Sequence, residues 1–389
     1  MNNYLANHVA TLPPSGIRKF FDLVATMKDV ISLGVGEPDF VTPWTVRESG
    51  IFSLEEGQTM YTSNSGLFEL REELAHHLNK TLGLSYSPLG EILITSGASE
   101  AVDLVMRAVL EPGDVVLVPD PSYVSYAPCA ILSGAKVNYV PTYAREDFRM
   151  RVEDLKKVYT PEAKLLVLSY PNNPTGAIMT REDLLPIADF VAEHDLLVLA
   201  DDIYSDLTYD HTHVSFASLP GMRDRTLFVS GFSKSYAMTG WRIGYVAGHA
   251  DLIQGMTKIH QYTMLCAPIM GQFAAIEALR SAHEAKDDMV KAYDRRRRLL
   301  VHGFRQMGLD CFEPLGAFYV FPDISKTRLS SEAFAEQLLK EEKVAVVPGT
   351  AFGPSGEGHI RCSYAYSIEQ LQEALKRIGS FVERRLNNL

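Results

Sequence analysis

Residues 226–248 read TLFVSGFSKSYAMTGWRIGYVAG. Two apolar runs, at 226–232 and 242–248, enclose a turn that carries Lys234, and Arg242 opens the second run. The short connection between the runs favours two antiparallel strands. The whole stretch contains no acid, although acids outnumber bases in the chain. Two isolated cations in such a stretch are either exposed side chains or groups that bind something negative or electrophilic.

Five further apolar or β-branched runs precede these two and predict further strands. Several are apolar on both faces, as expected for strands that helices cover on both sides. Helix-compatible segments lie between most of the runs, and this alternation favours a mostly parallel, doubly wound sheet. We therefore expect an α/β fold with a mostly parallel seven-stranded sheet and helices on both faces. The five runs are EILIT (91–95), DVVLVP (114–119), KVNYV (136–140), KLLVLS (164–169) and DLLVLA (195–200).

The chain has 389 residues, which is more than one ordinary core supports. After about residue 280 a charged helical stretch leads into GAFYVFPDI, another helix, VAVVPGTAFG and HIRCSYA, which indicates a smaller α+β domain. We expect a large domain at 46–280, a small domain at 281–389, and an N-terminal segment, 1–45, that packs with the small domain. The RRRR cluster at 295–298 is interpreted as a solvated helix face.

The charge balance argues against several classes of partner. The chain has 37 basic and 48 acidic residues, a net charge of −11, so we expect no general attraction for nucleic acid or anionic membranes. Neither a signal peptide nor a membrane-spanning run is evident. Four cysteines without metal-ligand or disulfide spacing favour a reduced, cytoplasmic setting. They are Cys129, Cys266, Cys311 and Cys362.

Reactive side chains follow four of the predicted strands, where an open α/β sheet binds its ligands. SGASEA follows the first strand, and its small residues open a helix whose amides suit an anion. YPNNPTG offers an amide after the fourth strand, and Asp201, Asp202 and Tyr204 follow the fifth. Ser233 and Lys234 follow the sixth. No metal constellation is present in the sequence.

This combination of side chains matches the needs of pyridoxal phosphate. Its aldehyde forms a Schiff base with a lysine, its ring nitrogen needs a carboxylate, and its phenolate oxygen needs neutral donors. The common nucleotide motifs are absent: there is no GxxxxGK[ST], and GVGEPD (34–39) lacks the third glycine of GxGxxG. The sequence therefore predicts a pyridoxal-phosphate protein rather than a nucleotide enzyme.

Five ordered motifs resemble those of the class I/II aminotransferases, the fold-type-I pyridoxal-phosphate enzymes of the aspartate aminotransferase superfamily. They are LGVGEPDF, PNNPTG, DDIY, SKSYAMTGWRIGY and HIRCSYA, and they span nearly the whole chain. The resemblance implies a homodimer with shared active sites. Within the family the chain is most similar to the aromatic and broad-specificity prokaryotic members.

The resemblance assigns the catalytic residues. It implies that Lys234 is the Schiff-base lysine and the base that moves a proton, and that Asp201 is the partner of the ring nitrogen. Asp202 is the competing reading, but only Asp201 stands three residues before Tyr204, as the family requires. Tyr204 and Asn173 resemble the donors to the phenolate oxygen.

The resemblance also implies cofactor- and substrate-binding residues. For the phosphate they are Arg242, Ser233 and an anion cradle formed by the amides of Gly97, Ala98 and Ser99. Tyr123 would stack on the cofactor ring, and Tyr61 would reach the phosphate of the neighbouring subunit. Arg361 would bind the substrate α-carboxylate with two parallel hydrogen bonds, a task that lysine performs poorly. Gly36, and Asn173 again, would border that carboxylate.

Two departures from the family pattern bear on these expectations. Gly231 stands where many relatives have serine, so one phosphate hydrogen bond is expected to be missing. Ser99 stands where some prokaryotic aspartate aminotransferases have a lysine for the distal carboxylate of acidic substrates. The expected reaction is therefore transfer of the amino group of an aromatic or other neutral L-amino acid, such as alanine, to a 2-oxoacid. Aspartate or N-acetyl-diaminopimelate transamination, or a β-lyase reaction on the same fold, are the alternatives.

Overall fold

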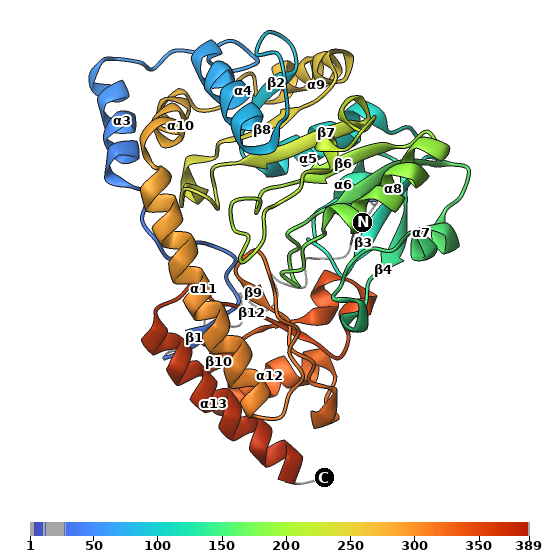
Figure 1. Cartoon of the computed structure of the whole chain (residues 1–389), viewed down its shortest axis with the longest axis vertical. Coiled ribbons are helices and arrows are strands. Elements are labelled where there is room, and N and C mark those ends of the chain that lie inside the picture. The colour runs from blue at the N-terminus through green and yellow to red at the C-terminus, as the bar shows by residue number, and fades with distance from the viewer. Residues whose placement is uncertain (1–3, 11, 13–26, 28, 388–389) are drawn as a thin grey trace.

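The centre of the molecule is a seven-stranded sheet, seen in a computed structural model that describes residues 4–10, 12, 27 and 29–387 (Figure 1). Its strands lie in the order β2-β8-β7-β6-β5-β3-β4. β8 is antiparallel to both of its neighbours, and the other pairs are parallel. The predicted α/β fold with a mostly parallel sheet is therefore confirmed. The bounds are β2 (Ile92–Thr95), β3 (Val115–Asp120), β4 (Lys136–Pro141), β5 (Ala163–Leu168), β6 (Leu197–Asp201), β7 (Thr226–Gly231) and β8 (Gly244–Ala247).

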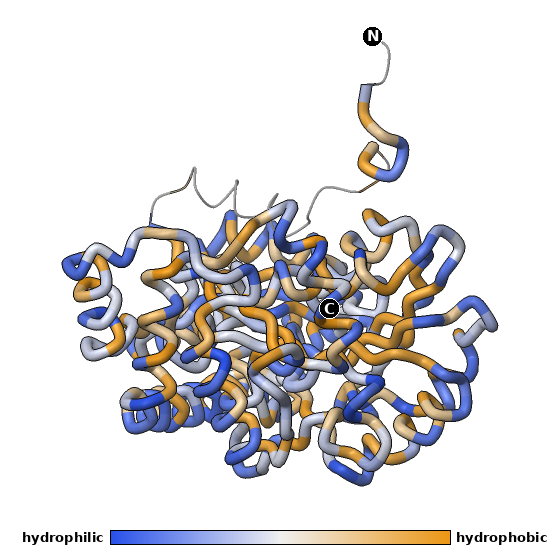
Figure 2. Tube along the Cα trace, turned by 90° about the horizontal axis from the view of Figure 1, so that it is seen from above, coloured by the Kyte–Doolittle hydropathy of each residue, from blue (hydrophilic) through white to orange (hydrophobic). Residues whose placement is uncertain are grey.

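Helices cover both faces of this sheet because its strands are apolar on both sides. In β3, Val115 and Leu117 join the hydrophobic cluster on one face, whereas Val116 and Val118 join the cluster on the other. The first face packs against α4, α7, α8 and α10, and the second against α5, α6 and α9. Apolar stretches accordingly cross the interior in Figure 2. The bounds are α4 (Phe68–Leu82), α5 (Ala98–Val109), α6 (Tyr126–Leu132), α7 (Val152–Val158), α8 (Arg181–Glu193), α9 (Ala250–Thr263) and α10 (Ile269–Ser281), with α3 (Trp44–Glu55) packed on α10.

Local sequence signals set the ends of these helices. At the start of α8, the Thr180 N–H donates to Asp183 Oδ2 at 2.8 Å and the Asp183 N–H donates to Thr180 Oγ1 at 3.3 Å, forming a capping box. α5 begins at Ala98 without a side-chain cap, so its first amides have no partner within the helix. The start of α5 is therefore available to bind an acceptor.

The strand directions bring distant parts of the chain to one edge. Because β2, β5, β6 and β7 run the same way, the segments that follow them meet at the carboxyl edge of the sheet. These segments carry the anion cradle, Asn173, the end of β6 at Asp201, and Lys234. The sheet topology therefore places four of the predicted functional segments side by side.

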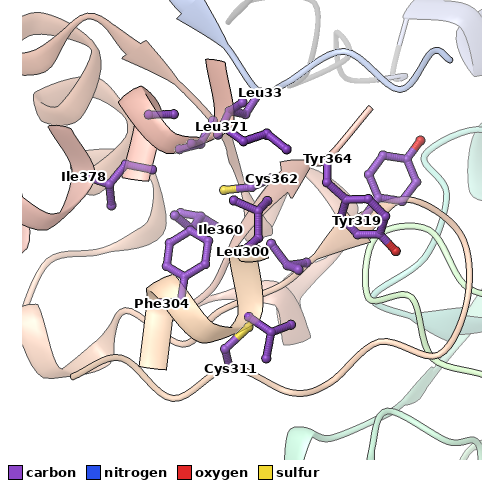
Figure 3. Close-up of a cluster of buried hydrophobic side chains, with 14 of the residues drawn as sticks. Leu33, Leu300, Phe304, Cys311, Tyr319, Ile360, Cys362, Tyr364, Leu371 and Ile378 are labelled. Atoms are coloured by element: carbon purple, nitrogen blue, oxygen red, sulfur yellow. The ribbon is translucent and has the colours of Figure 1, made fainter. Parts of the chain in front are cut away.

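The second half of the molecule is built around α11, α12 and α13. Three short strands form an antiparallel sheet in the order β11-β12-β9. Figure 3 shows how side chains from α11, α13, β12 and the N-terminal segment converge into one core. They include Leu300 and Phe304, Leu371 and Ile378, Ile360 and Cys362, and Leu33. The bounds are β9 (Tyr319–Val320), β11 (Val347–Pro348), β12 (Ile360–Ser363), α11 (His283–Gln306), α12 (Ser331–Glu342) and α13 (Ile368–Asn387).

The N-terminal segment joins this second half through β1. β1 (Ile31–Ser32) pairs in parallel with β10 (Val344–Ala345), and the Leu33 side chain is fully buried in the same core. This pairing supports the expected packing of the segment, whose residues 1–3, 11, 13–26 and 28 lie outside the described residues. The three-part division at 45 and 280 stays a prediction.

The arginine cluster of α11 departs from the expected solvated face. Arg297 is fully buried, and its Nη2 donates to Asp294 at 2.6 Å and to Asp210 at 3.1 Å. Its Nη1 donates to the Pro314 carbonyl at 3.0 Å. The interpretation of this residue as solvated was wrong because two of its acceptors, Asp210 and the Pro314 carbonyl, lie outside α11 and cover its side chain. Arg297 therefore ties α11 to both halves of the chain.

Arg297→Ala is expected to lower the free energy of unfolding by about 3 kcal/mol, because it removes a fully buried side chain and leaves the buried Pro314 carbonyl without this donor. Arg298→Ala is the matched control, since Arg298 contacts the same two acids, Asp294 and Asp210, but is exposed. Its loss should cost less than about 1 kcal/mol. Urea denaturation of both variants measures the difference, and equal losses would contradict the role given to burial.

Candidate active site

A cavity of about 410 Å³ opens at the carboxyl edge of the sheet. Its lining comes from the segments after β2, β3, β5, β6 and β7, from the N-terminal segment, and from β9 and β12. Of the predicted site residues, Gly97 lies outside this lining and Tyr61 is 81% exposed elsewhere on the chain. The others line the cavity: Gly36, Ala98, Ser99, Tyr123, Asn173, Asp201, Tyr204, Ser233, Lys234, Arg242 and Arg361.

Lys234 lies in the turn after β7 and points into this cavity. Its Nζ donates to the Gly36 carbonyl at 2.7 Å. Burial lowers the pKa of the Lys234 amine from 10.5 to about 8, and the nearby Glu37 carboxylate opposes that shift. The position of Lys234 therefore favours a neutral, nucleophilic amine at a mildly alkaline pH.

Asp201 ends β6 and faces the same cavity. The Tyr126 hydroxyl donates to its Oδ2 at 2.7 Å, and the Ile203 N–H donates to its Oδ1 at 3.2 Å. Burial raises the pKa of the Asp201 carboxyl from 3.8 to about 6 in spite of these donors. Asp202 lies outside the lining and its Oδ2 is 2.9 Å from His213 Nε2. The geometry thus separates the two acids that the sequence left in competition.

Tyr126 and Ser169 are cavity residues that the sequence did not single out. The Tyr126 hydroxyl is buried and also lies 2.8 Å from Ser169 Oγ, so two partners fix its orientation. The available signal was its place three residues after Tyr123 in PSYVSY (121–126), at the start of α6. That spacing does not reveal the hydrogen bond to Asp201, because the two residues stand 75 positions apart.

Arg361 lies on β12 and closes the opposite side of the cavity. Its Nη1 donates to Asn173 Oδ1 at 2.8 Å, and its Nη2 donates to the Gly34 carbonyl at 2.6 Å. The rings of Tyr319 and Phe352 lie 4.4 and 4.7 Å from the guanidinium carbon. Its Nε is buried without a hydrogen-bond partner in the part of the chain that is described. The guanidinium is therefore held flat by its surroundings and has donor capacity left.

Two tyrosines and a glycine complete this side of the cavity. The Tyr204 and Tyr319 hydroxyls are 2.8 Å apart, and both residues are buried. A Cβ atom on Gly36 would lie 2.5 Å from the Tyr319 hydroxyl, so glycine is required for this close approach. Tyr204 is therefore held with its hydroxyl at the cavity wall.

The anion cradle, Gly97–Ser99, packs directly against Arg242. Gly97 has φ +82°, and a Cβ there would overlap the Arg242 guanidinium. Arg242 Nη1 donates to the Thr239 carbonyl at 3.1 Å, and its Nη2 donates to the Ser96 carbonyl at 3.4 Å. Uncapped helix amides beside a guanidinium form a site for a phosphate group.

The departure at Gly231 has a steric explanation. A Cβ on Gly231 would lie 3.0 Å from both the Gly244 Cα and the Ile243 carbonyl oxygen, so β7 and β8 leave little room for a side chain. At the other departure, Ser99 lines the cavity with a short neutral side chain. The lysine and arginine residues of the lining are Lys234, Arg242 and Arg361.

Within the described ranges, no cluster of three or more His, Cys, Asp or Glu side chains has an arrangement suited to a metal ion. In the same part of the chain, no helix has the length and apolar character needed to cross a membrane.

The donor set fits pyridoxal phosphate: a buried amine, a buried carboxylate, a guanidinium beside uncapped helix amides, and a second arginine with an unpaired buried nitrogen. Comparison with known proteins agrees with this fit. The family model "Aminotransferase class I and II" matches residues 28–378. The chain is 52% identical to YugH of Bacillus subtilis (strain 168), over 99% of this chain and 100% of that protein.

Two further relatives carry substrate names. The aspartate aminotransferase of Pyrococcus abyssi is 47% identical over 98% of this chain and 99% of its own length. The crystal structure of an aromatic aminotransferase from Pyrococcus horikoshii OT3 superposes with a TM-score of 0.91 and 46% identity, over 95% of this chain and 99% of that one. The chain belongs to the class I and II aminotransferases, enzymes that depend on pyridoxal phosphate.

Proposed function

We propose that this aminotransferase acts on an aromatic or other neutral L-amino acid, such as alanine, and passes the amino group to a 2-oxoacid such as 2-oxoglutarate or pyruvate in two half-reactions. The observation that carries the proposal is the lack of a spare cation. Of the cations in the described lining, Lys234 is needed for the cofactor aldehyde, Arg242 for its phosphate and Arg361 for the substrate α-carboxylate. The acid Glu37 also faces the cavity, which disfavours an anionic side chain.

Pyridoxal phosphate, when bound, supplies an electron-accepting ring. In the proposed site Asp201 holds the ring nitrogen, and Tyr204 and Asn173 donate to the phenolate oxygen. Tyr123 packs against the ring, and Arg242, Ser233 and the anion cradle hold the phosphate. Asp201 is ionised above about pH 6, so it stabilises a positive charge on the ring nitrogen near neutral pH.

Lys234 carries the proton transfer in this proposal. Because burial lowers the pKa of its amine to about 8, a useful fraction of the amine is neutral near physiological pH. The Gly36 carbonyl, 2.7 Å from Nζ, orients the amine at the cavity wall. The same segment borders the proposed carboxylate site, because the Gly34 carbonyl accepts from Arg361.

A homodimer with shared sites and a cytoplasmic location are also part of the proposal. Tyr61 is proposed to reach the phosphate of the neighbouring subunit. The support is the exposure of several large apolar side chains: Trp44 and Phe52 on α3, Met60 next to Tyr61 in sequence, and Tyr262 near the end of α9 are each more than half exposed. An exposed group of large apolar side chains is typical of an interface.

Lys234→Ala is expected to abolish both transamination and the visible absorbance of the bound cofactor, because no amine remains at the aldehyde. Lys258→Ala, which removes an exposed lysine of α9, should change neither. In the wild-type apoenzyme, the rate of band formation with pyridoxal should rise with pH and be half-maximal near pH 8. A midpoint near 10.5 would instead identify the reacting lysine as exposed.

Arg361→Lys is expected to lower kcat/KM by a factor equivalent to about 2–4 kcal/mol of transition-state stabilisation, because an ammonium cannot make two parallel hydrogen bonds to a carboxylate. Arg384→Lys is the control, since Arg384 is an exposed partner of Glu341 and Glu342 on the far helices. Steady-state kinetics with one amino acid and one 2-oxoacid measures the effect. An unchanged kcat/KM would remove Arg361 from the substrate site.

A panel of amino donors tests the substrate class. Phenylalanine, tyrosine and alanine should exceed aspartate in kcat/KM by at least about tenfold, since a buried unpaired carboxylate is costly. Preference for aspartate or N-acetyl-diaminopimelate would overturn the proposal of a neutral substrate. Release of pyruvate and ammonia without an added 2-oxoacid would identify a β-lyase instead.

A further inference from the structure

A mostly buried acid, Glu100, and a fully buried histidine, His260, lie next to the anion cradle. Glu100 stands in the first turn of α5, and its Oε2 accepts from the Ser96 N–H at 2.5 Å. Its Oε1 lies 2.6 Å from His260 Nδ1, which donates to it. The His260 side chain is fully buried, and that of Glu100 is 11% exposed. Neither residue lines the cavity, and neither was singled out from the sequence.

Glu100 and Arg242 bind the two backbone polar groups of Ser96. The Ser96 N–H is bound by Glu100, and the Ser96 carbonyl accepts from Arg242 Nη2 at 3.4 Å. Gly97 is the next residue and has φ +82°, so these two hydrogen bonds hold the chain at the point where it turns into α5. Ser96, which directly precedes the anion cradle, is thus bound at both its N–H and its carbonyl.

His260 connects the cradle to the end of α9. Its carbonyl accepts from the N–H groups of Met264 and Leu265, each at 2.9 Å. The Leu265 carbonyl in turn accepts from Asn64 Nδ2 at 2.7 Å, three residues after Tyr61. A continuous set of hydrogen bonds thus runs from the cradle to the segment that carries Tyr61.

Within the described ranges, the hydrogen bond between Nδ1 and Glu100 is the one that holds the His260 ring. Its Nε2 is buried and has no hydrogen-bond partner in the described ranges. An unpaired buried polar nitrogen lowers stability, so packing alone does not explain why a histidine stands here instead of an apolar residue. The feature that favours histidine at this position is therefore its hydrogen bond to the Glu100 carboxylate.

We propose that Glu100 and His260 are positioning residues for the cofactor phosphate: together they hold Ser96 so that the anion cradle and Arg242 face one phosphate group. The inference rests on the proposed role of the cradle as the phosphate site. The competing reading is a helix cap that stabilises α5 without affecting cofactor binding, because an acid at this helical position commonly binds a preceding amide.

A matched control exists elsewhere in the chain. Glu91 Oε2 accepts from the Ser87 N–H at 2.7 Å, four residues earlier, as Glu100 does from Ser96. The same carboxylate is paired with Arg223 at 2.7 Å, and Glu91 does not line the cavity. Glu91→Ala therefore removes an equivalent local interaction away from the cofactor site.

The test compares the affinities of the apoenzymes for pyridoxal phosphate and for pyridoxal, which lacks the phosphate, by titrating the visible absorbance. Glu100→Ala should weaken pyridoxal phosphate binding by about tenfold, the equivalent of one charge-assisted hydrogen bond. Its affinity for pyridoxal should stay within about twofold, and Glu91→Ala should change neither ligand. Equal weakening of both ligands, or no weakening of either, overturns the proposal.

Two further variants separate position from stability. Glu100→Gln should keep near-wild-type affinity, because its amide oxygen accepts from Ser96 and its amide nitrogen donates to Nδ1 of a His260 ring in the tautomer protonated at Nε2. His260→Phe keeps a buried ring of similar size, removes the donor, and should weaken pyridoxal phosphate selectively. A His260→Phe enzyme with unchanged affinity overturns the proposal even if Glu100→Ala does not fold. Equal affinity of the wild-type apoenzyme for both ligands would instead refute the cradle as the phosphate site.

Discussion

The close approach of β8 to the turn after β2 is the constraint on which the proposed cofactor site depends. A Cβ on Gly244 would overlap the backbone of Gly97 and Ala98, so only a glycine lets the two segments meet. Arg242 stands two residues before Gly244 with φ +57°, and this conformation turns its guanidinium onto the same turn. One antiparallel strand in a parallel sheet therefore delivers a cation to the uncapped start of α5.

The cavity shifts the pKa values of its acid and its amine towards each other by one physical cause. Burial raises the pKa of Asp201 to about 6 and lowers that of Lys234 to about 8, because each charged form loses hydration. Between these values both forms needed by the proposed chemistry are populated: an ionised acid and a partly neutral amine. A site that shifts both pKa values towards neutrality is typical of a catalytic centre.

The sequence predicted the parts of the site that follow strands, and it missed the parts that depend on distant contacts. Strand runs and the rule for carboxyl ends were enough to group Asp201 with Lys234. The contact between Glu100 and His260 joins residues 160 positions apart, and no local pattern in either segment indicates it. Arg297 was misread for the same reason, since a run of four arginines looks solvated until the acceptors of one member are known. The cross-subunit role of Tyr61 stays a prediction.

The pairing of β1 with β10 joins two segments that are far apart in the order of synthesis. Ile31 pairs with Val344, so β1 has this partner only after the more than 300 residues between them have been synthesised. The segment that follows β1 supplies the carbonyls of Gly34 and Gly36, which hold Arg361 and Lys234. A nascent chain can therefore form its central sheet before synthesis ends. Arg361, however, joins Lys234 in the cavity only after β12 has been synthesised.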